Sequence, residues 1–194
     1  MATAILRRLR WPPGGLGLGT PLNSALFSDR DRKKFVKSAW QFILVGVATA
    51  GAMIGLDHLL FAGVSRQVIR ALGAQPVLVR CAIIVFSAIS EELIYRLGVS
   101  TLIAWLAALA LSPVGPVRKT IAIWIGIIVA AVLFGLAHVA NLPNAPHPFL
   151  RAISLNGVAG IVLGWLYWRR GLEAAVIAHL SADAFIYFGI ASII

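Results

Sequence analysis

The sequence has little charge, few acidic residues and one cysteine. Only 12% of its 194 residues are charged, whereas about a quarter of the residues in a soluble globular domain are. The single cysteine, Cys81, excludes an internal disulfide and any metal site built from several cysteines. The alternation of polar and apolar residues that is typical of a membrane β-barrel is also absent. These absences exclude an ordinary soluble domain, a disulfide-stabilised domain and a barrel.

The chain is instead rich in long apolar runs. It is 60% hydrophobic, with a mean hydropathy of +0.90, and a transmembrane helix needs a run of about 20 apolar residues. We therefore predict an all-α, polytopic transmembrane helical bundle. The predicted spans lie at residues 38–61, within 76–111, and at 120–139, 149–168 and 172–194.

The number of spans depends on the long apolar region 76–111. It is either one long tilted helix or two helices broken near Gly98, which gives five or six spans. A single crossing places Arg118 and Lys119 on the same side as the basic N-terminal residues, and the positive-inside rule favours that arrangement. In the predicted span 149–168, Gly160 and Gly164 have the GxxxG spacing of a tightly packed helix pair.

Residues 1–37 form a basic N-terminal segment that precedes the predicted membrane domain, residues 38–194. The segment carries eight Lys and Arg against two Asp, a net charge of +6, and its Pro- and Gly-rich residues 11–19 indicate flexibility. No apolar run follows Arg7–Arg10, so it is not a signal peptide. Without a recognition motif the basic charge indicates contact with anionic lipid rather than with nucleic acid. We expect an integral protein of the cell (inner) membrane with a cytoplasmic N-terminus.

Charged residues within the apolar spans mark the candidate site. Glu91, Glu92 and Arg96 lie close together in the region 76–111, although one charge near the bilayer centre costs about 2.5–3.5 kcal/mol on insertion scales. By contrast, Asp57 and His58 lie at the far end of the first span, where we interpret them as an interfacial helix end. Charges inside a span indicate a functional site by default.

The candidate residues occur in pairs at helical i,i+4 spacing, which places both members of a pair on one helix face. The pairs are Glu92 with Arg96, Phe134 with His138, and His179 with Asp183. If the turn near residue 115 closes a hairpin, Glu91 lies 24 residues before it and His138 lies 23 after it, at similar depth. His179 lies close behind the Arg170 turn, so straight spans would place it at a shallower level unless a tilt, a break or a re-entrant segment intervenes.

These residue types suit hydrolysis by an activated water. A carboxylate in a low-dielectric setting is a stronger base, a histidine can share its proton, and a second histidine can donate to an oxyanion. Ser87 and Ser90 have no evident base for a serine triad. A purely structural interpretation remains open: Glu92–Arg96 as an ion pair that orients Glu91, and each histidine as a packed core residue whose tautomer a carboxylate such as Asp183 fixes.

The order and spacing of the pairs resemble the CPBP (Abi) intramembrane proteases, which include the type II CAAX prenyl endopeptidases. The resemblance covers about residues 76–190, in Glu91-Glu92-x-x-x-Arg96, Phe134-x-x-x-His138 and His179-x-x-x-Asp183, and in the stretches Gly164-Trp165-Leu166-Tyr167 and Gly171-Leu172-Glu173-Ala174-Ala175. A Gly often follows the arginine of the first motif in that family, whereas here Leu97 does.

The resemblance implies a polar, water-filled cavity inside the bundle and a role for each motif residue. Glu91 would activate water with help from His138, Glu92 and Arg96 would support it, His179 and Asp183 would stabilise the oxyanion, and Phe134 would shape the pocket. The substrate would be a membrane-associated protein, such as one with a prenylated CAAX tail. Both a divalent metal such as Zn²⁺, held by Glu91, His138 and His179, and a metal-free glutamate mechanism fit these residue types.

Two other function classes remain as alternatives. A scaffold or immunity factor with the same fold would use these residues to bind a partner without proteolysis. A proton-coupled transporter also buries Glu and His, but the small number of spans and the missing repeats disfavour it. The sequence leaves the oligomeric state open.

Overall fold

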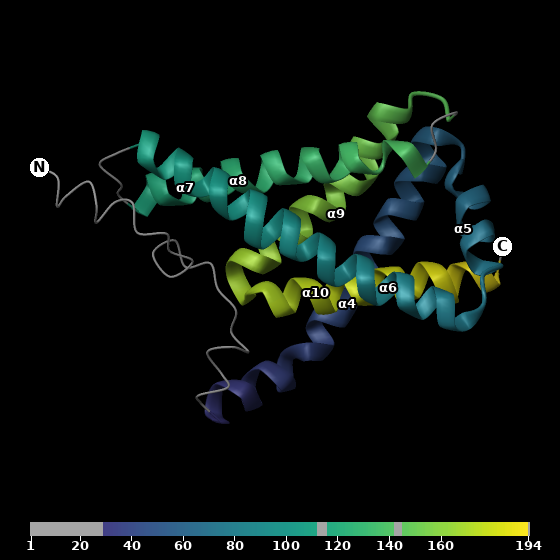
Figure 1. The fold of residues 1–194 in the computed structure, drawn as a ribbon, viewed down its shortest axis with the longest axis horizontal. Helices are drawn as coiled ribbons and strands as arrows, with labels where there is room; N and C mark the ends of the chain where they lie inside the picture. Colours follow the sequence, from purple (N-terminus) through teal and green to yellow (C-terminus); the bar gives the residue numbers. More distant parts are fainter. Residues whose placement is uncertain (1–28, 112–115, 142–144, 194) are drawn as a thin grey trace, which may run out of the picture.

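A computed structural model describes residues 29–111, 116–141 and 145–193, and these residues form helices and short connections with no strand. The all-α prediction is therefore confirmed for the described part of the chain. The α-helices are α4 (Asp29–Phe61), α5 (Ser65–Gly73), α6 (Val77–Glu92), α7 (Thr101–Ala110), α8 (Pro116–Ala137), α9 (Pro148–Arg170) and α10 (Leu172–Ala184) (Figure 1). The Pro- and Gly-rich residues 11–19 lie outside the described residues.

Four helical stretches are long and apolar enough to cross a membrane, and the chain is an integral membrane protein. They are Phe35–Phe61, Pro116–Asn141, Pro148–Arg170 and Leu172–Gly189. Hydropathy located all four. The first helix itself begins at Asp29, well before the predicted boundary at residue 38, because hydropathy marks where the membrane begins and a helix continues into the interface.

The continuous helix made of α6, the π-helical segment Leu93–Ser100 and α7 is long enough for a fifth crossing. The backbone stays helical at both junctions, Glu92 and Thr101, so Val77–Ala110 is one rod of about 50 Å at ~1.5 Å per residue. That length exceeds a bilayer core of about 30 Å. The single-helix interpretation of residues 76–111 is therefore correct, and a break near Gly98 is wrong because the helix widens there without ending.

The α8–α9 hairpin packs through glycines. A Cβ added to Gly160 would lie 2.7 Å from the Ala131 Cα, and one added to Gly164 would lie 2.9 Å from the Ile127 side chain. Such distances leave no room for a side chain, so the backbones are in direct contact, as the GxxxG spacing predicts. This contact fixes the position of α8, and with it the end from which His138 projects.

The turn between α9 and α10 is buried within the bundle. Gly171 makes it with φ of 95°, in the region that favours glycine. Tyr167, just before it, is fully buried and shares a hydrogen bond of 2.9 Å with Thr101. In Figure 1 this turn lies well inside the end reached by α7 and α8. Consequently α10 begins deep in the bundle, and His179 lies deeper than straight spans predict.

Asp57, at the end of the first span, is buried within the protein and has partners that the sequence did not indicate. It is 3% exposed and accepts hydrogen bonds from Arg151 Nε at 3.0 Å and from the Ser65 backbone N–H at 2.9 Å. Its neighbour His58 is exposed, in contrast to Asp57. Hydropathy could not find the partner because Arg151 is in another helix, near the end of its span. The next helix, α5, begins at Ser65, which hydrogen-bonds to both members of this ion pair.

The glycine contacts give a stability prediction. Gly160→Ala should lower the free energy of unfolding by about 1–3 kcal/mol, because its methyl group collides with the α8 backbone. Gly55→Ala in α4 is the matched control, since a Cβ there meets nothing within 4 Å and alanine favours a helix. Unfolding of both variants in one detergent tests this. Equal stabilities would contradict the inferred backbone contact.

Candidate active site

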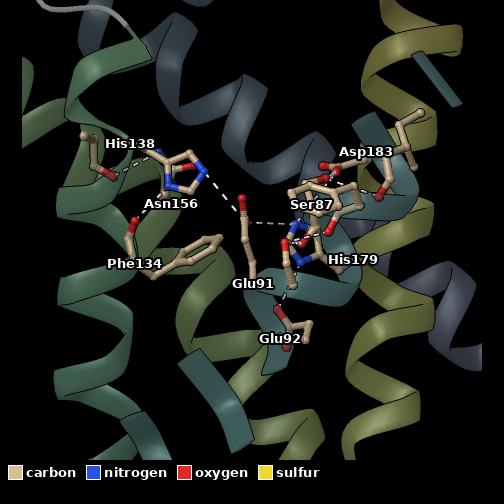
Figure 2. Close-up of polar contacts among 12 residues, drawn as sticks. Ser87, Glu91, Glu92, Phe134, His138, Asn156, His179 and Asp183 are labelled. Carbon is tan, nitrogen blue, oxygen red and sulfur yellow. Dashed lines mark hydrogen bonds and ion pairs between the residues drawn. The ribbon is translucent and has the colours of Figure 1, made fainter. Parts of the chain in front are cut away.

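Four of the residues predicted from the sequence, on three separate segments, line one cavity of about 290 Å³. Glu91 comes from α6, His138 from the turn directly after α8, and His179 and Asp183 from α10, as Figure 2 shows. The structure therefore brings together residues that are up to 92 positions apart in the chain (91 to 183). The cavity also reaches α4, α5 and α9, with Met53, Ile54, Val68, Ile69, Leu72 and Leu155 as apolar lining residues.

Glu91 lies between the two imidazole rings. Its Oε2 atom is 4.0 Å from His138 Nε2 and 3.8 Å from His179 Nε2. Both separations are too long for a direct hydrogen bond, but they suit a water molecule that bonds to two polar groups. The Glu91 side chain is 25% exposed, so solvent within the cavity can reach it.

Hydrogen bonds on the far side of each ring determine the histidine tautomers. His138 Nδ1 lies 2.8 Å from the Phe134 carbonyl oxygen, and His179 Nδ1 lies 3.0 Å from Glu92 Oε1. A carbonyl or carboxylate oxygen only accepts, so each Nδ1 donates its proton. In a neutral ring the Nε2 atom then carries a lone pair toward Glu91. Both histidines can therefore accept a proton from a water beside Glu91.

Glu92 faces away from the cavity and is fully buried. Its Oε2 atom is 3.0 Å from Arg96 Nε, with both side chains 0% exposed, while its Oε1 accepts from His179. The sequence predicted the pair with Arg96 at i,i+4 but assigned it to orienting Glu91. The side chain that Glu92 contacts and orients is instead His179, and this contact joins α6 to α10.

The buried Arg96 guanidinium makes few polar contacts. Its Nε atom is close to Glu92 but not aligned for a hydrogen bond, and within the described residues its Nη atoms have no hydrogen-bond partner. Its charge also lies 5.0 Å from the Phe134 ring, at cation–π distance. The Phe134 ring in turn lies 4.7 Å from His138 and 6.0 Å from His179. Phe134 thus packs against both histidines.

Several polar residues of the cavity were not found from the sequence as members of the site, Ser87 and Asn156 among them. Ser87 donates to Asp183 Oδ2 at 3.0 Å and lies one turn before Glu91, so its i−4 spacing was the available signal. Asn156 of α9 donates to the Ala152 carbonyl at 3.2 Å and lines the cavity. Asn156 is uncharged, so the search for charged residues within the apolar spans did not select it. Asp183 Oδ2 also lies 3.8 Å from His179 Nε2.

The three residues that would hold a metal, Glu91, His138 and His179, are spaced more widely than bound zinc ligands. Tetrahedral ligands bound to Zn²⁺ at about 2.0 Å lie about 3.3 Å apart, whereas Glu91 Oε2 is 3.8 and 4.0 Å from the histidine nitrogens. In the parts of the chain that the structure describes, no three His, Cys, Asp or Glu residues form a metal-binding group. The spacing of these side chains therefore does not fit a tetrahedral Zn²⁺ ion.

Comparison with known proteins identifies a family. The model of the family described as "Type II CAAX prenyl endopeptidase Rce1-like" matches residues 73–185, which is more than half of the chain. No curated protein and no solved structure matches the chain. The matched region includes Glu91, Glu92, Arg96, Phe134, His138, His179 and Asp183.

The buried ion pair gives a second stability prediction. Arg96→Met should lower the free energy of unfolding by about 3–5 kcal/mol, because it leaves the Glu92 charge buried without a partner. Adding Glu92→Gln to that variant should restore part of the loss, since glutamine has no charge and its oxygen still accepts from His179. A double-mutant cycle measured by detergent unfolding tests this. Additive losses would show that the two side chains do not depend on each other.

Proposed function

The chain belongs to the Type II CAAX prenyl endopeptidase Rce1-like family, and from this premise we propose an intramembrane endopeptidase that cleaves with a water activated by Glu91. Family membership supports a peptide-bond hydrolase in general. The observation that carries the finer proposal is the position of the Glu91 carboxylate, within 4.0 Å of two histidine Nε2 atoms in a cavity inside a membrane bundle. Neither the metal dependence nor the substrate follows from membership alone.

In the proposed reaction Glu91 is the general base. A water between Glu91 and His138 loses a proton to the carboxylate as its oxygen attacks the carbonyl carbon of the scissile bond. A new C–O bond forms and the carbonyl oxygen becomes an oxyanion. The tetrahedral intermediate then breaks its C–N bond, and the departing amine takes the proton from Glu91. The atoms and charges balance without any other reactant.

His179 is the proposed oxyanion donor. Glu92 holds the Nδ1 proton on the far side of the ring, at 3.0 Å, so the Nε2 atom points into the cavity and donates when the ring is protonated. Asp183, itself held by Ser87 at 3.0 Å, lies 3.8 Å from that Nε2 atom. Glu92 and Arg96 act through His179, as positioning residues. Phe134 restricts the space around both rings.

The proposed substrate is a short peptide segment of a membrane-associated protein, including a prenylated CAAX-type tail. A cavity of about 290 Å³ lies at the lower end of the range for ligand pockets, so it admits a few residues and excludes a folded domain. The apolar wall from α4 and α5 suits aliphatic side chains. Many large apolar side chains on the outer helix faces are exposed and contact membrane lipids.

Replacing the proposed base tests the mechanism directly. Glu91→Gln should lower kcat by at least 100-fold, because general-base catalysis typically contributes about 10²–10⁴, while the unfolding temperature stays close to that of the wild type. Ser90→Ala is the matched control: this neighbouring hydroxyl bonds only to backbone carbonyls of its own helix. Full activity of Glu91→Gln would overturn the mechanism and favour a scaffold that binds a partner without proteolysis.

A chelator arm in the same assay addresses the metal question. We expect a glutamate-dependent reaction that keeps its rate after treatment with a zinc chelator and dialysis. If the rate is lost and added Zn²⁺ restores it, the metal-dependent alternative replaces the mechanism described above, with Glu91 as a ligand.

We also propose that the N-terminus is cytoplasmic, in the cell (inner) membrane. With five crossings, the start of α4, the start of α8 and the end of α9 share one side, which then carries most of the basic residues. Helix α5, which lines the cavity, lies on the other side, and so do the ends of α4 and α8 (Figure 1). This orientation determines from which side a substrate reaches Glu91.

Cysteine labelling tests the orientation. In a Cys81→Ser background, Gln67→Cys in α5 should react with an impermeant maleimide in intact cells, and Val117→Cys in α8 should react only after permeabilisation. Both positions are exposed. The reverse pattern would contradict the proposed orientation and turn the α5 side toward the cytoplasm.

A further inference from the structure

Arg151 supplies the cavity with its cation. It is the only Lys or Arg among the described residues that line the cavity, which also contains the carboxylates of Glu91 and Asp183. Arg151 lies in the first turn of α9, within the region matched by the family. The mechanism above does not use it, although a charged side chain buried in a membrane protein usually has a function.

The guanidinium of Arg151 is held in a fixed orientation. Its Nε donates to Asp57 Oδ1 at 3.0 Å and its Nη2 donates to Ser65 Oγ, with only 9% of the side chain exposed. Asp57 is itself held by the Ser65 backbone N–H at 2.9 Å. An arginine has five N–H donors in a rigid fork, and these two bonds leave the others available. The fork is therefore pre-organised at the cavity wall.

An anionic ligand in this cavity would need a cation as its partner, because two carboxylates already line the cavity. Glu91 and Asp183 repel a second carboxylate, and burying an unpaired carboxylate is costly. A fixed guanidinium offsets both effects, because it forms charge-assisted, bidentate bonds with a carboxylate. Glu91 and Asp183 belong to α6 and α10, whereas Arg151, Asp57 and Ser65 belong to α9, α4 and α5. The cavity is thus lined by carboxylates from α6 and α10 and by a guanidinium from α9, whose partners lie in α4 and α5.

We infer that Arg151 binds the terminal carboxylate of the substrate and so restricts cleavage to peptide bonds near a chain end. This inference rests on the proposed function. A CAAX motif is by definition the last four residues of a chain, so a segment that enters the cavity from it brings a free α-carboxylate. The terminal carboxylate of a substrate pairs with the Arg151 guanidinium, whereas an internal peptide segment has no carboxylate to offer it.

The test compares two peptides of identical sequence, one ending in a free carboxylate and one in an amide. For the wild type, kcat/KM should be at least tenfold higher for the carboxylate peptide. Arg151→Gln should reduce that ratio to within twofold of one. Arg169→Gln, at the exposed far end of the same helix, is the matched control and should keep the wild-type ratio. A wild-type ratio within twofold of one would overturn the inference without any variant.

Asp57→Asn separates recognition from a structural role. If Arg151 only ties α9 to α4, both Arg151→Gln and Asp57→Asn should slow the two peptides equally and leave the carboxylate-to-amide ratio unchanged, which overturns the inference. If Arg151 binds the carboxylate, Asp57→Asn should keep a ratio of tenfold or more, because the guanidinium remains and has lost a competing anion.

A binding measurement separates this inference from the proposed function. If the wild type cleaves neither peptide, the proposed function fails, and the tripeptide Val-Ile-Met is then titrated into wild type and Arg151→Gln as the free acid and as the amide. Tighter binding of the acid that disappears in Arg151→Gln supports carboxylate recognition. Equal binding of acid and amide by the wild type overturns it.

Discussion

The buried ion pair between Glu92 and Arg96, extended by the hydrogen bond from His179, is the interaction on which the rest of the site depends. Both charged side chains are 0% exposed, so each would be strongly unfavourable alone in a membrane interior. Because Glu92 also accepts from His179, the charge that stabilises α6 fixes the rotation and tautomer of a histidine on α10. The fold and the orientation of the site are therefore set by the same three side chains.

Two adjacent glutamates consequently have separate roles. Neighbouring positions on a helix are about 100° apart, so Glu91 faces the cavity while Glu92 faces α10. Glu91 has no cation at its own i,i+4 position, and its nearest ionisable partners are the imidazoles. It is thus the carboxylate that can exchange a proton with water. The buried charge of Glu92 is paired with Arg96, whereas the Glu91 carboxylate faces the cavity.

Local patterns in the sequence located the long helices and selected four residues that meet in one cavity, but they did not show how distant helices meet. Hydropathy located the crossings, and i,i+4 spacing selected the side chains that share a face. The depth of His179 could not be predicted, because it follows from the buried turn at Gly171 and from the contact of Tyr167 with Thr101. The pairing of Asp57 with Arg151 spans 94 positions, and no periodicity reports such a partner. The wider π-helical turn after Glu92 likewise has no signal in hydropathy.

The family match begins at residue 73, yet part of the cavity wall comes from before it. Met53, Ile54 and helix α5 line the cavity, and Asp57 holds the Arg151 fork from the same part of the chain. Glu91, His138, His179 and Asp183 therefore lie in one portion of the polypeptide, while part of the cavity wall lies in another. Substitutions before residue 73 can change the shape of that wall without changing any of these four side chains.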